Sequence, residues 1–174
     1  MLTLTLLALA LAGFLIYVAM RPSDFRIERS LTLSASLEMV FARINDLRQF
    51  NSWNPFALAD PAIQLTYSGS SSGQDAAYHW ESKGRAGTGS MKITESTAPT
   101  RVVMDLKFIK PFAANNVATF ALTPDGTGTK VTWSMTGCNR YTHKLMGTIF
   151  NMDKMVGGEF AKGLNNLKAL VSLP

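Results

Sequence analysis

Hydrophobic positions form one uninterrupted run at the beginning of the chain. Residues 2–20 carry no charge and are mostly leucine and alanine, and Arg21 and Pro22 follow directly. A helix of this length measures ~28 Å, which is close to the ~30 Å hydrocarbon core of a bilayer. The run therefore predicts a single-pass helix that crosses a membrane through residues 2–20.

A cleaved signal peptide is the alternative interpretation of this run, because small residues occur within 8–12 and 18–20. No Lys or Arg precedes the run, and it is longer than the apolar core of a usual signal peptide, so an uncleaved signal-anchor is favoured. Arginines follow the span, and the positive-inside rule then predicts a cytoplasmic domain. Acidic residues lie among these arginines, so the orientation stays open.

Period-two alternation of apolar and polar residues predicts β-strands over much of the remaining chain. The alternating runs are 25–33, 64–67, 77–82, 91–94, 101–109, 116–123 and 130–135. Segments rich in Gly, Ser, Pro and Asp separate them, and Asp-Gly-Thr-Gly at 125–128 is typical of a hairpin turn. Most of these strands follow one another through short turns, which predicts an antiparallel meander with one apolar face.

Two short helices are expected between the first strand and the second. Ser34 and Ser36 are candidate N-caps for the first helix. Its apolar face consists of Val40, Phe41, Ile44 and Leu47. The pair Asn54-Pro55 favours an extended or turn conformation, so the second helix is expected to end by Trp53.

Residues 142–171 predict one long amphipathic helix, which would need a sheet to cover its apolar stripe. The stripe consists of Met152, Met155, Val156, Phe160, Leu164, Leu167 and Val171. Gly157, Gly158 and Gly163 each lower helix stability by up to ~1 kcal/mol relative to alanine. We therefore expect close backbone contacts at these glycines, or space that another molecule occupies.

The length of 174 residues fits one domain with an appendage. We expect a transmembrane signal-anchor at residues 1–21 and one folded domain at residues 22–174. The net charge of +5 is mildly basic, and no Lys/Arg-rich run of the kind that binds nucleic acid occurs, so no nucleic acid partner is expected. The single cysteine, Cys138, cannot form an internal disulfide, so the domain depends on its own core.

Few residues have the chemistry of a catalytic pair. His79 and Glu81 share one face of a predicted strand, and Tyr78 and Trp80 share the other. A solvated His79–Glu81 pair is the favoured interpretation; a shift in strand phase by one residue would turn both inward as an acid/base pair. His143 has no acidic neighbour in the sequence.

Metal and cofactor motifs are not recognisable in the sequence. Two histidines, one cysteine and no HExxH motif leave no zinc site, so no metal and no cofactor are expected. Residues 126–130 contain glycines and a lysine without the spacing of a phosphate loop, and they fit a hairpin turn. Cys138 lacks an evident base and is expected to be a small buried residue. The catalytic residues, if any, stay unknown.

Several short segments resemble one known family. They are INDL at 44–47, WNP at 53–55, TYSG at 66–69, YHWE at 78–81, GSMKITE at 89–95, VTWSM at 131–135 and NMDKMVG at 151–157. With the order of predicted elements, they resemble the START-like or SRPBCC superfamily, closest to its polyketide cyclase/dehydrase-like branch, over residues 25–170. The resemblance implies an α+β helix-grip fold, in which a curved antiparallel sheet wraps around the long C-terminal helix, beside the N-terminal transmembrane helix.

The resemblance also implies an apolar cavity between sheet and helix, for a lipid, a polyketide or an aromatic compound. An empty void of ~300 Å³ would cost on the order of 7 kcal/mol, which a marginally stable domain could hardly carry, so we expect a small, wet or filled cavity. Methionines adapt to irregular shapes, and Trp and Tyr add polar groups. The expected lining consists of Trp53, Tyr67, Tyr78, Trp80, Met91, Met104, Phe108, Phe120, Trp133, Met135, Met155 and Phe160.

Three functions fit these expectations. The favoured function is a membrane-anchored, non-enzymatic protein that binds a hydrophobic small molecule. The first alternative is an enzyme of the polyketide cyclase or dehydratase type, which an inward His79 or Asp105 would favour. The second is an accessory module that recognises a protein partner through residues 68–73 and the outer face of the sheet. The identity of the ligand and the oligomeric state are not predicted.

Overall fold

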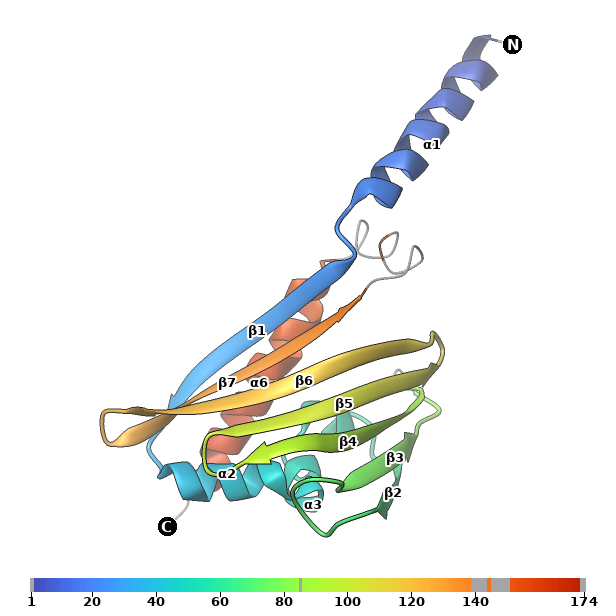
Figure 1. Cartoon of the computed structure of the whole chain (residues 1–174). Helices are drawn as coiled ribbons and strands as arrows, with labels where there is room; N and C mark the ends of the chain where they lie inside the picture. Colours follow the sequence, from blue (N-terminus) through green and yellow to red (C-terminus); the bar gives the residue numbers. More distant parts are fainter. Residues whose placement is uncertain (1, 85, 139–143, 145–150, 173–174) are drawn as a thin grey trace.

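The computed structural model describes residues 2–84, 86–138, 144 and 151–172. After the N-terminal helix the elements follow the predicted order of a strand, short helices, further strands and a C-terminal helix (Figure 1). The short helices contact the C-terminal helix. The elements are α1 (Leu2–Met20), β1 (Asp24–Leu33), α2 (Leu37–Asn45), α3 (Leu47–Asn51), α4 (Pro55–Leu58), β2 (Gln64–Ser68), β3 (Ala77–Glu81), β4 (Thr88–Thr97), β5 (Arg101–Lys110), β6 (Ala114–Asp125), β7 (Gly128–Cys138) and α6 (Met152–Val171).

The strands of the described chain form one seven-stranded sheet in the order β1-β7-β6-β5-β4-β3-β2. Every neighbouring pair is antiparallel, so β2 to β7 form the predicted meander and β1 adds to its last strand. The hairpin expected at 125–128 is present, with Asp125 paired to Gly128 and Gly126 at a φ of 60°. The sheet therefore ends in the long strand β1 at one edge and the short strand β2 at the other.

The inner face of the sheet carries the predicted apolar residues. On β6, Ala118, Phe120 and Leu122 are buried, and on β7 Trp133 is buried beside Phe120. The helix α6 crosses this face and buries Phe160, Leu164, Leu167 and Val171 (Figure 1). The seven-stranded antiparallel sheet with its C-terminal helix fits the helix-grip fold.

The C-terminal helix begins later than the sequence predicted. We expected one helix over 142–171, but α6 starts at Met152, because Asn151 is an extended N-cap whose side chain accepts a hydrogen bond from the backbone N–H of Lys154. An N-cap residue has a non-helical backbone and ends the helix in that direction. Apart from Lys144, residues 139–150 lie outside the described part of the chain, and His143 is among them.

The short helices differ from the prediction in one respect. Ser36, not Ser34, caps α2, and Asp46 caps α3, which ends at Asn51 as expected. The segment after Trp53 was expected to be extended or a turn. Instead Asn54 caps a further short helix, α4, because a proline fits the first position of a helix and its fixed φ suits helical geometry.

Two of the three helix glycines lie where α6 contacts the sheet layer most closely. A Cβ at Gly157 would lie 2.2 Å from Nη2 of Arg29, and a Cβ at Gly163 would lie 2.7 Å from Cζ3 of Trp133. The expected close approach is therefore present at both positions. A Cβ at Gly158 would meet nothing within 4 Å, and the structure offers no packing reason for this glycine.

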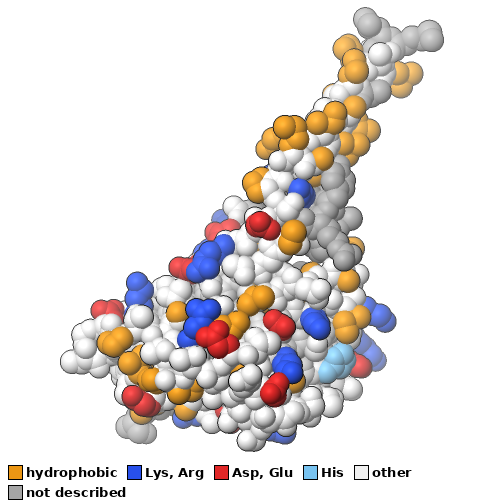
Figure 2. Space-filling model, viewed as in Figure 1, with side chains coloured by type: hydrophobic (Ala, Val, Ile, Leu, Met, Phe, Trp, Pro, Cys, Tyr) orange, Lys and Arg blue, Asp and Glu red, His pale blue; other side chains and the backbone are white. Residues whose placement is uncertain are grey.

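The N-terminal helix α1 extends away from the domain (Figure 1). Its side chains are exposed almost throughout, and hydrophobic side chains cover it on the visible face, whereas charged side chains gather on the domain and at the base of the helix (Figure 2). Within the described residues, Thr3–Met20 is the one segment long and apolar enough to cross a membrane.

Candidate functional site

A large cavity lies between the inner face of the sheet and α6. Its volume is about 1160 Å³, slightly above the usual ~300–1,000 Å³ of ligand pockets. Residues of all seven strands supply one wall, and residues of α3, α4 and α6 supply the other. The wall is mostly apolar. Covering apolar surface so that it no longer contacts water stabilises a protein or complex by ~25 cal/mol per Å². The site therefore favours an apolar occupant.

The structure brings eight of the twelve predicted residues together around this cavity. They are Tyr78, Trp80, Met91, Phe108, Trp133, Met135, Met155 and Phe160. Trp53, Met104 and Phe120 are fully buried in the core instead, and Trp53 packs edge-on against Phe50 with ring centroids 4.9 Å apart. Tyr67 borders a separate recess of about 160 Å³, with Arg48 over its ring at 4.2 Å.

The cavity wall contains a chain of buried polar groups that the sequence analysis did not single out. Asn54, the cap of α4, is 4% exposed and donates from Nδ2 to Oδ1 of Asn51 at 3.0 Å. Asn51, at the end of α3, donates from Nδ2 to the hydroxyl of Tyr67 at 3.2 Å. Both asparagines border the cavity. From the sequence, the Asn54-Pro55 pair was interpreted only as the end of a helix. An asparagine followed by a proline is also typical of a helix N-cap, which is what the structure shows.

Tyr78 lies beside this polar chain, with its ring 5.9 Å from that of Tyr67. Burial raises the pKa of Tyr78 above its ordinary value, and the nearby Tyr67 adds to the rise, while a hydrogen bond with Asn51 opposes it. The phenol is therefore neutral at physiological pH. Together with the amides it offers uncharged hydrogen-bonding groups inside an apolar cavity, as a carbonyl or hydroxyl of a hydrophobic molecule would require.

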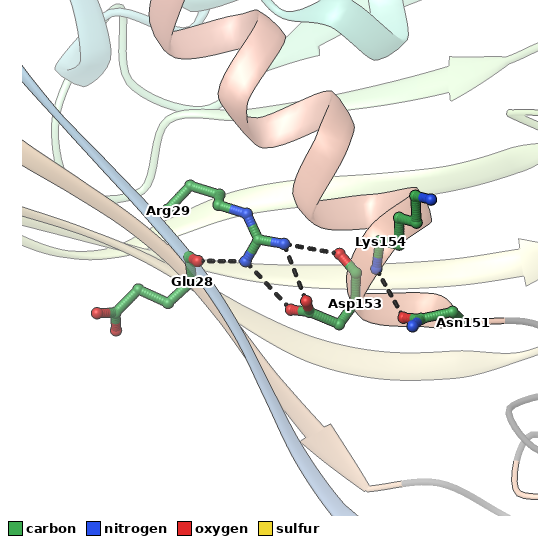
Figure 3. Close-up of polar contacts among 5 residues, drawn as sticks. All are labelled: Glu28, Arg29, Asn151, Asp153 and Lys154. Atoms are coloured by element: carbon green, nitrogen blue, oxygen red, sulfur yellow. Dashed lines mark hydrogen bonds and ion pairs between the residues drawn. The ribbon is translucent and has the colours of Figure 1, made fainter.

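An ion pair joins β1 to the first turn of α6 at one side of the cavity (Figure 3). The guanidinium of Arg29 donates from Nη2 to Oδ2 of Asp153 at 2.9 Å and from Nη1 to Oδ1 at 3.1 Å. It also donates to the backbone oxygens of Asp153 and Glu28. Arg29 shares the inner face of β1 with apolar residues, and Gly157 leaves the space that its guanidinium fills. This pair was not predicted.

The Asp153 carboxylate gives the stability of the protein a specific pH dependence. Its hydrogen bond to Arg29 lowers the pKa of Asp153 below the ordinary value. The stabilising contribution is therefore complete above the ordinary carboxyl pKa of ~3.9 and is lost as the pH falls through the lowered value. We expect Asp153→Asn to lower the melting temperature at neutral pH and to reduce its fall on acidification.

The matched control for this prediction is Asp105→Asn. Asp105 is exposed on the outer face of β5 and has no ion pair among the described residues. This control should follow the wild-type curve of melting temperature against pH. If the Asp153→Asn curve also follows it, the ion pair with Arg29 does not contribute to stability.

Charged groups gather at the end of the cavity nearest to α1. Arg21, Arg26 and Lys110 border it there, together with Asp24. Cys138, the last residue of β7, pairs with Asp24 in the sheet register and also borders the cavity. The prediction that Cys138 is buried is wrong, because the strand end extends beyond the packed core and its thiol side chain is exposed.

The acid/base candidates His79, Glu81 and Asp105 lie away from the cavity. His79 and Glu81 point to the outer face, with Nε2 and Oε1 3.4 Å apart, which confirms the predicted solvated pair. Asp105 is exposed on that face as well. Among the residues that the structure describes, no cluster of His, Cys, Asp and Glu could hold a metal ion.

The family comparison assigns this architecture. The model of a family described as "Polyketide cyclase / dehydrase and lipid transport" matches residues 24–172. The chain belongs to this family. No sequence among the curated proteins matches the chain.

Solved structures support the same fold. Protein CV1439 from Chromobacterium violaceum is 15% identical with a TM-score of 0.60, covering 88% of this chain and all of its own. CalU16 from Micromonospora echinospora is 15% identical with a TM-score of 0.53, covering 86% of this chain and 76% of its own. DynU16, a protein in the dynemicin biosynthetic locus, is 12% identical with a TM-score of 0.57, covering 83% of this chain and 46% of its own. At these identities the likeness is one of fold.

Proposed function

We propose that this protein binds a hydrophobic small molecule, of lipid, polyketide or aromatic type, in the cavity between the sheet and α6. The observation that carries the proposal is the size and apolar lining of a cavity of about 1160 Å³. The family description, which includes lipid transport, supports it. The neutral groups Asn51, Asn54 and Tyr78 would orient a carbonyl or hydroxyl of the ligand.

The proposal includes a membrane anchor. Residues 1–21 form the anchor, and residues 22–174 form the ligand-binding domain. The uncharged helix α1 supports this division, since it is long and apolar enough to cross a bilayer. The arginines after the span favour a cytoplasmic domain by the positive-inside rule, and the acidic residues among them leave the orientation open. The anchor would keep the binding domain beside a reservoir of hydrophobic molecules.

The test uses the chain shortened to residues 21–174 and purified without detergent. Organic extraction and native mass spectrometry should then find a hydrophobic molecule in a near-stoichiometric amount. A folded, monodisperse protein that carries no such molecule, and takes up none from added lipid extracts, would contradict the proposal. An insoluble product would contradict the expected independence of the domain.

A cyclase or dehydratase is the second candidate. The family description and the biosynthetic locus of DynU16 favour it, and Tyr78 beside Asn51 is the described pair that could hydrogen-bond a reacting carbonyl. The outward positions of His79, Glu81 and Asp105 favour the binder instead. Conversion of an extracted ligand by the purified protein, and its loss in Tyr78→Phe, would establish the enzyme.

A further inference from the structure

The cavity and the apolar helix meet at the same end of the domain. Tyr17 from the last turns of α1, and Arg21 and Pro22 from the connection, border the cavity directly. The side chain of Lys144 donates to the backbone oxygen of Ala19 at 3.2 Å, so the last turn of α1 also contacts the domain. The cavity therefore extends to the base of the helix that is proposed to cross the bilayer.

The connection between α1 and the domain is short. The helix ends at Met20 and β1 begins at Asp24, so four peptide steps separate them and reach at most ~14 Å. If α1 spans the hydrocarbon, this tether holds the beginning of β1 within the headgroup layer or directly beside it, since the headgroups extend the bilayer to ~40–45 Å. Phe25, the second residue of β1, borders the cavity as well.

The surface around this end suits a membrane. Phe112, in the connection between β5 and β6, borders the cavity and is 58% exposed, and the neighbouring Ile109 is 53% exposed. Lys110, between them, borders the cavity and has no ion pair among the described residues. Exposed apolar side chains next to lysine are the pattern of segments that rest in the interface of an anionic bilayer.

From this geometry we infer that the cavity mouth rests on the bilayer surface and that the ligand is a bilayer lipid, which enters the cavity from the adjacent leaflet. This inference rests on the proposed function and names the source and route of the ligand. The acyl chain passes between apolar surfaces, so its methylene groups avoid contact with water. The headgroup stays near Lys110 at the mouth.

The single cysteine gives a direct test of the position of the mouth. The full chain is labelled at Cys138 with an environment-sensitive fluorophore and reconstituted into vesicles of phosphatidylcholine and phosphatidylglycerol. The control carries Cys138→Ser and Thr127→Cys, which moves the label to the β6–β7 turn, ~36 Å along β7 at ~3.3 Å per residue. Lipids with a spin label near the headgroup should quench the label at Cys138 strongly and leave the control unquenched.

Photo-crosslinking tests the source of the ligand. The same vesicles are prepared with a phospholipid that carries a diazirine in its acyl chain, and irradiation should attach it to peptides that line the cavity, such as those of β6 and α6. Lys110→Glu should reduce this crosslinking. Lys107→Glu should not, because Lys107 is an exposed residue of β5 that lies farther from the mouth.

The outcomes separate this inference from the proposed function. Equal quenching of both labels, or quenching of neither, overturns the position of the mouth, and so does a chain that fails to float with the vesicles. Crosslinks confined to α1 overturn the route. If the domain nevertheless yields a stoichiometric hydrophobic molecule, only this inference fails. If the mouth is quenched but the cavity yields no ligand, the proposed function fails together with the lipid and its route, and only the position of the mouth stands.

Discussion

The Gly163→Ala substitution is expected to lower the free energy of unfolding by on the order of 1–2 kcal/mol, although alanine is the better helix former. The new Cβ would lie 2.7 Å from Cζ3 of Trp133 and 2.8 Å from Cδ of Pro55. Neither atom ends a flexible side chain. The indole of Trp133 is stacked on Phe160 with centroids 4.2 Å apart, and Pro55 opens α4. Either the helix moves away from the sheet, or the indole tilts toward the cavity.

The matched control for Gly163→Ala is Gly158→Ala in the same helix. Its Cβ would meet nothing within 4 Å, so only helix propensity changes, and we expect a gain of ~0.5–1 kcal/mol. Denaturant unfolding of both variants measures the difference. Equal stabilisation in the two variants would show that α6 does not approach Trp133 and Pro55 as closely as the structure indicates.

The strands and their inward faces could be predicted because alternation is a local property. Each strand of the sheet needs one apolar face, and the period of two reports it over a few residues. The faces of Tyr78 and Trp80, and the outward position of His79, follow from this rule alone. The predicted start of the C-terminal helix was wrong, because the stripe of apolar residues does not indicate where a helix begins. The N-cap at Asn151 sets the start of α6.

The contacts that shape the site could not be predicted from local patterns. Arg29 and Asp153 are far apart in the chain, and only the crossing of β1 by α6 brings them together. Arg29 is nonetheless a charge on an apolar strand face, and that anomaly is a signal for a buried or bridging partner. Whether an inward residue lines the cavity or packs in the core depends on the local distance between α6 and the curved sheet. Trp53, Met104 and Phe120 share the periodicity of the lining residues, but they pack as core.

The Ala118→Trp substitution is expected to reduce the amount of co-purified ligand by ~10-fold or more, because the indole would occupy space that the ligand needs. Ala118 borders the cavity from the middle of β6, between Met104 on β5 and Met135 on β7. Organic extraction with mass spectrometry gives the ligand per protein. The control is Val117→Trp on the same strand, whose side chain is 36% exposed on the outer face.

A second cavity variant protects this test against misfolding. Ala57→Trp adds the same side chain from α4, on the opposite wall, where the residue is half-buried. Both cavity variants should lose the ligand while Val117→Trp keeps it, since only the cavity variants change the space between the sheet and the helices. Full retention of ligand by either folded cavity variant would place the binding site elsewhere. An occupied cavity also predicts that wild-type protein loses stability when its ligand is extracted, because a ligand bound only to the folded state stabilises it by mass action.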